Sequence, residues 1–237
     1  MSKFAVILAA AGKSSRFGDP NTKKVFTTID TKPLWLFSAE KFSARDDVGQ
    51  LLIVISPEDE EDFKQKYGAN AAILGIQTVL GGAERADSVR NALEAVREDL
   101  EFVAIHDAAR PCISEADIDA VFAKARQTGA ALLGTRCSAT LKRTNQENAV
   151  VETVPRENVW LAQTPQVFHR EKLLRAYAAS ENASQATDEA SLLEAQGETV
   201  TVVEGSPLNI KVTTRADLKF VQLALKARPN AKAFPFD

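Results

Sequence analysis

Short apolar runs recur along the chain, and each is followed by a longer stretch in which apolar residues recur at helical spacing. Runs of this length are typical of strands that are buried on both faces of a parallel sheet. The pattern therefore predicts a first strand that begins at Phe4 and further strands at residues 51–55, 76–80, 102–106, 131–134, 199–203 and 209–212.

The stretches between these strands carry residues that begin and end helices. Pro33 suits the first position of a helix that extends to about Ala44, and Ser56 suits the cap of the next helix. Further helices are expected after Gly81-Gly82, at residues 114–129, 170–179 and 188–196, and from Thr214 or Arg215. Strands that alternate with helices predict an α/β fold with a Rossmann-like, mostly parallel sheet flanked by helices.

One segment, from about residue 136 to 160, breaks this alternation. It is polar, with β-like pieces at 140–142 and 150–154. This pattern predicts a β-hairpin that protrudes from the main sheet. An isolated hairpin is only marginally stable in water, so we expect an arm that packs on the second subunit of a homodimer. Residues 1–237 are otherwise expected to form a single domain.

Composition narrows the class of protein. The chain has 237 residues, of which 45% are hydrophobic and 26% charged, as suits one large α/β domain. Its formal net charge of −3 gives no basic field, so we expect no nucleic acid or membrane partner. Cys112 and Cys137 lack metal-ligand spacing, and His106 and His169 lie far apart. Because no segment resembles a signal peptide or a membrane span, a cytoplasmic, reducing location is expected.

The first strand opens into small residues and then into cations. Ala10, Ala11 and Gly12 follow the apolar run and allow the backbone to turn sharply and approach a ligand. The cations that come next are Lys13, Arg16, Lys23 and Lys24. Backbone N–H groups in such a turn bind anions, and the cations add charge, so the stretch predicts a phosphate site.

Two common phosphate-binding motifs do not fit this loop. Gly12-Lys13 resembles the end of a P-loop, but that motif needs a glycine about five positions earlier, where the chain has Ile7. The dinucleotide fingerprint needs a glycine where the chain has Ser14. An ordinary strand-to-helix turn with solvated cations remains an alternative for this stretch taken alone.

Further candidates follow the carboxyl ends of other predicted strands, where ligands bind in open α/β sheets. Gly82, Arg85 and Ser88 form one group, in which backbone groups and the hydroxyl can meet a nucleobase. A glycine turn before a capped helix is the alternative. Asp107 and Arg110 form another group, in which the carboxylate can hold Mg²⁺ or sugar hydroxyls and the guanidinium a phosphate. A local ion pair is the alternative there.

Three later positions are weaker candidates when taken alone. Arg156 and Thr164 suit phosphate ligands, although an exposed arginine and a Thr-Pro turn explain them equally well. Lys211 lies within a predicted strand, where a lysine is unusual unless its charge meets an anion. Residues 187–191 predict, by themselves, only a helix cap.

The first loop is similar to the signature of sugar-phosphate nucleotidyltransferases. Residues 8–16 followed by Lys24 match L-A-A-G-x-x-x-R and a later lysine, with one extra alanine. Ser14 replaces a glycine that is common in that family, and Lys23 replaces a proline. The apolar pair that follows Lys24 favours it over Lys23 as the functional lysine.

The motifs, taken in order, extend this resemblance over nearly the whole chain. They are Ala10–Gly12, Gly81–Val89, His106–Pro111, Thr140–Arg143, Gln163–Phe168, Thr187–Ser191 and Asn209–Thr213. Together they resemble the 2-C-methyl-D-erythritol 4-phosphate cytidylyltransferase family of non-mevalonate isoprenoid synthesis. Leu208 stands where that family often has an acidic residue.

The resemblance implies a fold of the nucleotide-diphospho-sugar transferase type and transfer of a cytidylyl group from CTP to the sugar-alcohol phosphate. It implies catalysis by Arg16, Lys24 and Lys211. The implied CTP site comprises Ala10, Ala11, Gly12, Gly82, Ser88 and Asp107. The implied substrate site comprises Asp107, Arg110, Thr140, Arg156, Thr164, Thr187 and Lys211. Thr140 and Arg156 would come from the partner's arm, and Asp107 would also meet Mg²⁺.

Three other functions fit parts of the pattern. The sister family that acts on ribitol 5-phosphate differs in a pocket that the sequence does not identify. A CTP-binding protein without catalysis is suggested by Ser14 and Lys23. A nicotinamide dehydrogenase is disfavoured because the glycine spacing of its fingerprint is missing.

Overall fold

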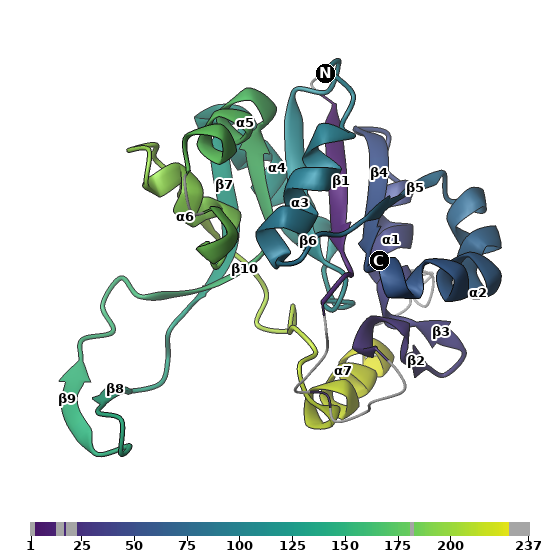
Figure 1. Cartoon of the computed structure of the whole chain (residues 1–237). Coiled ribbons are helices and arrows are strands. Elements are labelled where there is room, and N and C mark those ends of the chain that lie inside the picture. The colour runs from purple at the N-terminus through teal and green to yellow at the C-terminus, as the bar shows by residue number, and fades with distance from the viewer. Residues whose placement is uncertain (1–2, 13–16, 18–22, 181–182, 228–237) are drawn as a thin grey trace, which may run out of the picture.

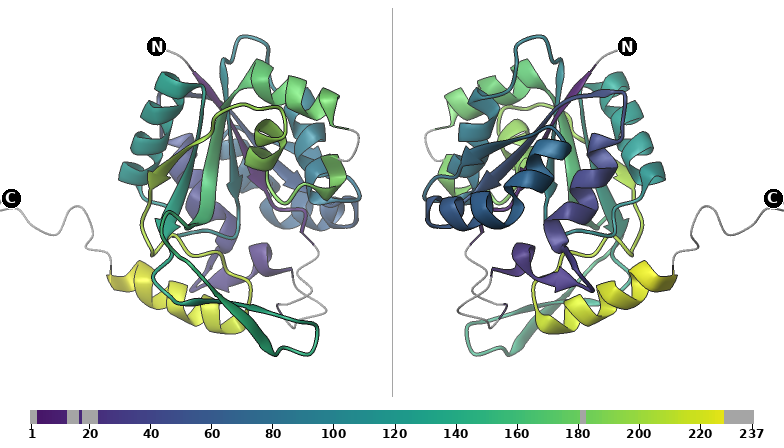
Figure 2. Two further views of the ribbon diagram at one scale, coloured as in Figure 1. Left: turned by 90° about the vertical axis from the view of Figure 1, so that its left-hand side faces the viewer. Right: turned by 90° about the vertical axis from the view of Figure 1, so that its right-hand side faces the viewer.

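The architecture is a seven-stranded sheet with helices on both faces (Figures 1 and 2). This computed structural model describes residues 3–12, 17, 23–180 and 183–227. In spatial order the strands are β11 (Thr201–Glu204), β7 (Ala130–Arg136), β10 (Trp160–His169), β6 (Phe102–Asp107), β1 (Phe4–Ala9), β4 (Val48–Ile55) and β5 (Ile76–Leu80). All neighbouring pairs are parallel except those of β10, which is antiparallel to β6 and β7. The predicted mostly parallel α/β sheet is confirmed.

The central strand β1 is buried on both faces. Phe4 and Leu8 point into one core cluster and Ile7 into the other, because successive strand residues alternate between faces. The first cluster is completed by α1 (Leu34–Ser43), α2 (Glu60–Ile73) and α4 (Glu115–Thr128). The second is completed by α3 (Arg85–Glu94), α5 (Arg170–Ala179) and α6 (Glu189–Glu194). This burial explains the unbroken apolar run near the N-terminus.

Two strand predictions are wrong. Residues 160–169, which were not predicted as a strand, form β10 in the middle of the sheet, and the ladder with β7 shifts register around Pro165. Residues 209–212, which were predicted as a strand, join no sheet. The N–H of Val212 instead donates to the carbonyl of Ala109 at 2.8 Å, which fixes this extended segment beside the end of β6.

Two helix starts also differ from prediction. The Ser56 side chain does not cap the following helix, because its hydroxyl lies 2.6 Å from the Glu58 carboxylate and 2.9 Å from that of Asp59. A short 3-10 turn, η3 (Pro57–Asp59), precedes α2. Pro33 lies immediately before α1 rather than within it.

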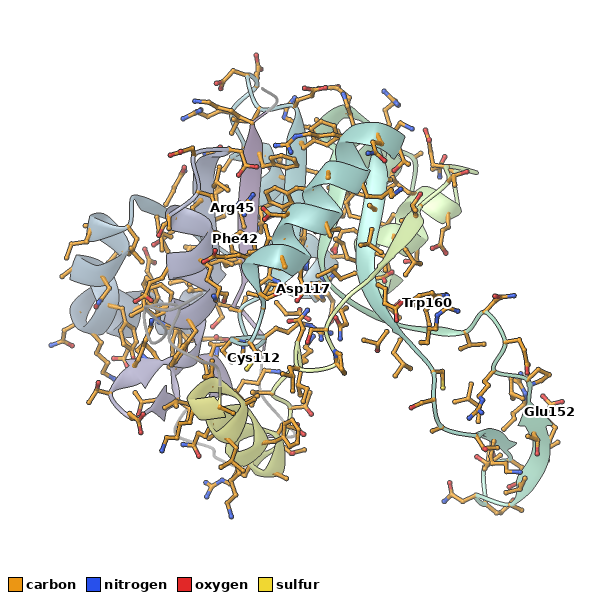
Figure 3. The ribbon with its side chains drawn as sticks, turned by 180° about the vertical axis from the view of Figure 1, so that it is seen from behind. Phe42, Arg45, Cys112, Asp117, Glu152 and Trp160 are labelled. Atoms are coloured by element: carbon orange, nitrogen blue, oxygen red, sulfur yellow. The ribbon has the colours of Figure 1, made fainter. Side chains whose placement is uncertain are left out.

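The predicted hairpin arm is present. Its strands β8 (Leu141–Thr144) and β9 (Val150–Val154) pair only with each other and stand away from the main sheet (Figure 1). Trp160 lies at the base of the arm and Glu152 near its tip (Figure 3). Val150 and Val151 are 61% and 63% exposed, so the arm buries little apolar surface in this chain.

The carboxyl edge of the sheet is flanked by α7 (Arg215–Ala227), the short turn η2 (Lys24–Phe26) and the small strands β2 (Thr28–Ile29) and β3 (Lys32–Pro33) (Figure 1). Of these elements, β2 and α7 contribute to an apolar cluster that includes Ile29, Leu34, Cys112, Val212 and Val221. This cluster holds the extended segment 209–212 next to the sheet edge. Over the parts of the chain that the structure describes, no helix is long and apolar enough to span a membrane.

Candidate functional site

A cavity of about 700 Å³ opens where β1, β4, β5 and β6 end. Its volume lies in the usual range of small-molecule sites. Nine of the candidate residues singled out in the sequence line it: Ala10, Ala11, Gly12, Lys24, Gly82, Arg85, Ser88, Asp107 and Lys211. The parallel sheet explains this convergence, because the carboxyl ends of its strands share one edge.

One wall of the cavity consists of small residues in tight contact. A side chain at Gly81 would place its Cβ 2.8 Å from both Ala11 Cβ and Ser88 Oγ, and one at Gly82 would lie 2.5 Å from Asp87 Cβ. Glycine is therefore required at both positions. The Gly82 N–H donates to Ser88 Oγ at 3.1 Å, so the serine hydroxyl also holds this loop in place.

Asp107 lies at the end of β6, between two cations. Its Oδ2 is 3.0 Å from Lys211 Nζ and 3.2 Å from Arg110 Nε. Burial alone would raise the pKa of Asp107, but the charges of Lys211, Arg110 and Arg85 outweigh burial and hold the pKa well below its ordinary value. The carboxylate is therefore anionic throughout the physiological range and keeps the Lys211 ammonium at the cavity.

Buried polar groups position Asp107 through hydrogen bonds to its backbone and its neighbours. Its N–H donates to Thr164 Oγ1 at 3.0 Å, and Thr164 Oγ1 lies 3.2 Å from His106 Nδ1. His106 Nε2 lies 3.3 Å from the Arg110 carbonyl, and burial lowers the histidine pKa to about 4. The neutral ring thus donates from Nε2, which leaves Nδ1 to accept the Thr164 hydroxyl proton.

The segment that carries Lys211 is anchored on both sides. Arg110 Nη1 donates to the Asn209 carbonyl at 2.8 Å, and the N–H of Thr213 donates to Asp217 at 2.9 Å. Burial alone would raise the pKa of Asp217, but hydrogen bonds from Thr213 and its neighbour lower it to about 2. Lys211 therefore sits on a backbone with little freedom to move, although it belongs to no strand.

The structure distinguishes the two neighbouring lysines. Lys23 Nζ forms ion pairs with Asp59 at 2.7 Å and Glu58 at 3.4 Å, whereas Lys24 lines the cavity. Lys23 is thus turned toward the acidic start of α2. This arrangement supports the choice of Lys24 as the functional lysine.

Arg85, which the sequence grouped with Gly82 and Ser88 without assigning it a contact of its own, also lines the cavity. It is the first residue of α3, and its guanidinium donates twice to the Glu189 carboxylate, at 2.6 and 2.9 Å. Its position three residues before Ser88 was a signal that it faces the same loop. The pairing with a residue 104 positions later could not be predicted.

Five other predicted residues lie outside the cavity lining, and one lies outside the described chain. Arg110 and Thr164 sit behind Asp107, where they position it. Arg156, at the base of the arm, donates to the Ser138 carbonyl, and Thr140 is exposed nearby. Thr187 lies just before α6. The substrate contacts expected of these five residues stay predictions, and Arg16 lies outside the described residues.

The cavity offers few protein ligands for Mg²⁺. No group of three or more histidine, cysteine, aspartate or glutamate side chains suited to a metal occurs in the described ranges. Asp107 offers one carboxylate, and its Oδ2 already faces two cations. A single carboxylate fits Mg²⁺ when substrate phosphates supply the other ligands, which is the usual arrangement for this ion.

Comparison with known proteins gives a consistent result. A family model described as "2-C-methyl-D-erythritol 4-phosphate cytidylyltransferase" matches residues 4–227. A protein of that name from Rhodopirellula baltica is 40% identical over 232 residues, which cover 93% of this chain and 94% of the relative. Another from Alkaliphilus oremlandii is 36% identical and covers 98% and 99%.

Solved structures show the same similarity in three dimensions. The cytidylyltransferase of that name from Thermus thermophilus has a TM-score of 0.78 and 30% identity, covering 95% of this chain and 100% of its own. The Francisella tularensis enzyme has a TM-score of 0.77 and 31% identity, covering 94% and 99%.

Proposed function

The chain belongs to the 2-C-methyl-D-erythritol 4-phosphate cytidylyltransferase family, and from that premise we propose that the cavity is its active site. Members transfer a cytidylyl group from CTP to 2-C-methyl-D-erythritol 4-phosphate and release pyrophosphate. The observation that carries the proposal is the convergence of three features in one cavity. These are the small-residue loop after β1, Lys24, and the Asp107–Lys211 pair.

CTP would occupy the side of the cavity formed by the two loops after β1 and β5. Ala10, Ala11 and Gly12 present backbone beside Lys24, as suits a triphosphate. Gly82 and Ser88 lie on the facing wall, as suits the edge of cytosine. Arg16 would add a further cation to the triphosphate site.

The acceptor phosphate would bind near Lys211. One of its oxygens attacks the α-phosphorus of CTP in line, a new P–O bond forms, and the bond to pyrophosphate breaks. No protein nucleophile is needed, because the attacking phosphate is already ionised. Catalysis then consists of positioning the two substrates and of stabilising the negative charge on the phosphoryl oxygens. Lys24, Lys211 and Arg16 would supply the positive charge that does this.

Mg²⁺ would be held by Asp107 together with phosphate oxygens of CTP. When bound, it supplies positive charge that offsets the repulsion between the phosphates. The role of this chain's residues is to keep the Asp107 carboxylate ionised and oriented, which the contacts of Arg110 and Thr164 support.

A homodimer would complete the substrate site. Thr140 and Arg156 lie at the base of an arm whose strands, within the described residues, pair only with each other, and the exposed Val150 and Val151 provide apolar surface for a partner. These two polar residues would then reach the acceptor in the other subunit, and Thr187 would lie near the ribose. The expected cytoplasmic location stays a prediction.

The test is pyrophosphate release by the full-length protein with CTP, Mg²⁺ and 2-C-methyl-D-erythritol 4-phosphate. Release with this acceptor, and none with ribitol 5-phosphate or without acceptor, is expected. Release only with ribitol phosphate would move the substrate assignment to the sister family. Removal of divalent cations with EDTA should abolish release, and added Mg²⁺ should restore it. CTP binding without release from either acceptor would contradict a catalytic role.

A further inference from the structure

No step of the proposed reaction uses the Arg85–Glu189 ion pair. The Glu189 side chain is 1% exposed, the lowest exposure of any carboxylate in the ion pairs that the structure describes. Its Oε1 also accepts the Tyr177 hydroxyl at 3.3 Å. The pair joins α3, at the cavity wall, to α6, which lies on the same face of the sheet.

Such a pair is costly to build. Removing a carboxylate from water carries a large desolvation penalty, which is offset only by good geometry and further hydrogen bonds. Both are present here, since the two guanidinium–carboxylate distances of 2.6 and 2.9 Å define a bidentate contact. A cavity residue held this firmly is a candidate for ligand contact.

The guanidinium has donors left for a ligand. An arginine has five N–H groups, and Glu189 uses one on each terminal nitrogen. The Arg85 side chain is 31% exposed and lines the cavity, so part of it faces the open volume. Because the buried carboxylate balances its charge, the pair presents donors with no net charge.

The position of Arg85 indicates which part of CTP it meets. Gly82 and Ser88, the wall assigned to cytosine, lie on either side of it in the sequence. Its charge also acts on Asp107, which lies where the reacting phosphates meet the acceptor. The ribose is the part of CTP that connects the base to the α-phosphate, so it must cross the space between these two points.

We propose that Arg85 donates a hydrogen bond to the ribose 2′-hydroxyl of CTP and that Glu189 positions it to do so. A neutral pair suits neutral hydroxyls better than it suits a triphosphate, which the separate cations bind. This inference rests on the proposed function, because it takes the placement of CTP from it. It makes Arg85 a determinant of the preference for ribonucleotides.

The test compares CTP with 2′-deoxy-CTP in the double variant Arg85→Gln/Glu189→Gln. Both charges are removed together, so no buried ion is left unpaired. We expect KM for CTP to rise about tenfold, as for loss of one hydrogen-bonding pair, with KM for 2′-deoxy-CTP changed less than about twofold. The preference for CTP over its deoxy analogue should therefore largely disappear, while kcat changes little.

Two single variants serve as controls. Arg85→Lys keeps the charge and loses the bidentate geometry, so it should reduce the preference only in part. Tyr177→Phe removes a contact to Glu189 outside the cavity and should leave the preference unchanged. An unchanged CTP preference in a folded double variant would overturn the proposal, as would equal losses for both nucleotides.

The outcome is separable from that of the proposed function. If the wild-type protein releases pyrophosphate but the double variant keeps its CTP preference, only the role of Arg85 fails. If the wild-type protein is inactive, calorimetric binding of CTP and 2′-deoxy-CTP to the wild-type and double-variant proteins applies the same criterion without turnover.

Discussion

The cavity and the hairpin arm use ion pairs in opposite ways. At the cavity, Arg85 meets a Glu189 side chain that is 1% exposed, and Asp107 meets two cations while 9% exposed. On the arm, Arg143 pairs with Glu152 across the hairpin, and the two side chains are 65% and 53% exposed. Water screens the ion pair on the arm. The ion pairs at the cavity lie in a low dielectric, where an unpaired charge costs much more free energy.

The charged groups of the cavity are held by several elements of a single chain, whereas the strands of the arm are not. The cavity holds its charged groups with contacts from β6, β10, α6 and the segment before α7, all within one chain. The strands of the arm, by contrast, pair only with each other and with no strand of the main sheet. Variants of the two regions should therefore differ in their effects on activity and stability.

If the proposed dimer forms through the arm, deletion of residues 142–152 should abolish activity and leave the protein monomeric. Among the described strands, β8 and β9 pair only with each other, so removal of the arm should leave the stability of the main sheet nearly unchanged. Light scattering measures the oligomeric state, pyrophosphate release the activity and thermal unfolding the stability. A dimer that persists after the deletion would contradict the proposed role of the arm.

Mixing two inactive variants sharpens the same prediction. Lys24→Ala damages the cavity, and Arg156→Ala damages the arm that would serve the other subunit. A mixed dimer then contains one intact site, so random exchange should restore about a quarter of wild-type activity, given that half of the dimers are mixed. A site built within one chain would give no recovery.

Glu189→Gln should destabilise the protein by about 3–5 kcal/mol, because it leaves the buried side of Arg85 without its counter-charge. The matched variant Glu152→Gln removes a carboxylate from the exposed pair and should cost less than about 1 kcal/mol. Urea unfolding of both variants gives the two values. Equal losses would show that burial does not distinguish the two regions.

Lys24→Ala should lower kcat about 100- to 1,000-fold, the effect of losing one donor that stabilises transition-state charge. Lys23→Ala should lower it less than about fivefold, because its ammonium pairs with Asp59 and Glu58 at a partly exposed site. Steady-state rates of pyrophosphate release provide the comparison. Similar small losses in both variants would refute the assignment of Lys24.

Asp217→Asn should cost about 1 kcal/mol at pH 7, as for loss of a helix cap. The folded pKa of Asp217 is lowered to about 2, below the ordinary value near 4 of the unfolded chain. Its contribution is therefore complete above about pH 4 and is lost as the pH falls toward 2. Urea unfolding at pH 7 and pH 3 should show the difference between variant and wild type shrinking. A constant difference would contradict an ionic origin.

Much of the sheet could be predicted because its strands are locally distinct. The strand at 76–80 was predicted with the bounds that the structure shows, and β1, β4 and β6 were recognised from apolar runs. The strand β10 was missed because Pro165 breaks the usual signal for a central strand. Its place is decided by β6 and β7, which enclose it on both sides.

The residues of the cavity were likewise predictable only where the signal is local in the sequence. The loop after β1 and the Asp107–Arg110 group were predictable, because small residues and charges follow buried strands there. Lys211 was assigned to a strand, but its position depends on Arg110 and Asp217, which hold the neighbouring backbone. Nothing near Lys211 in the sequence predicts an extended segment held in that way.

By itself, the sequence determined the alternation of strands and helices, the carboxyl edge at which ligands bind, the protruding hairpin and the family resemblance. These features depend on apolar periodicity and on short motifs, which act over a few residues. Only the tertiary structure decided that Arg85 meets Glu189, that Lys23 turns to Asp59, and that His106 supports Thr164. The physical reason is that the energy of a buried charge or hydrogen bond depends on which distant groups exclude water from it.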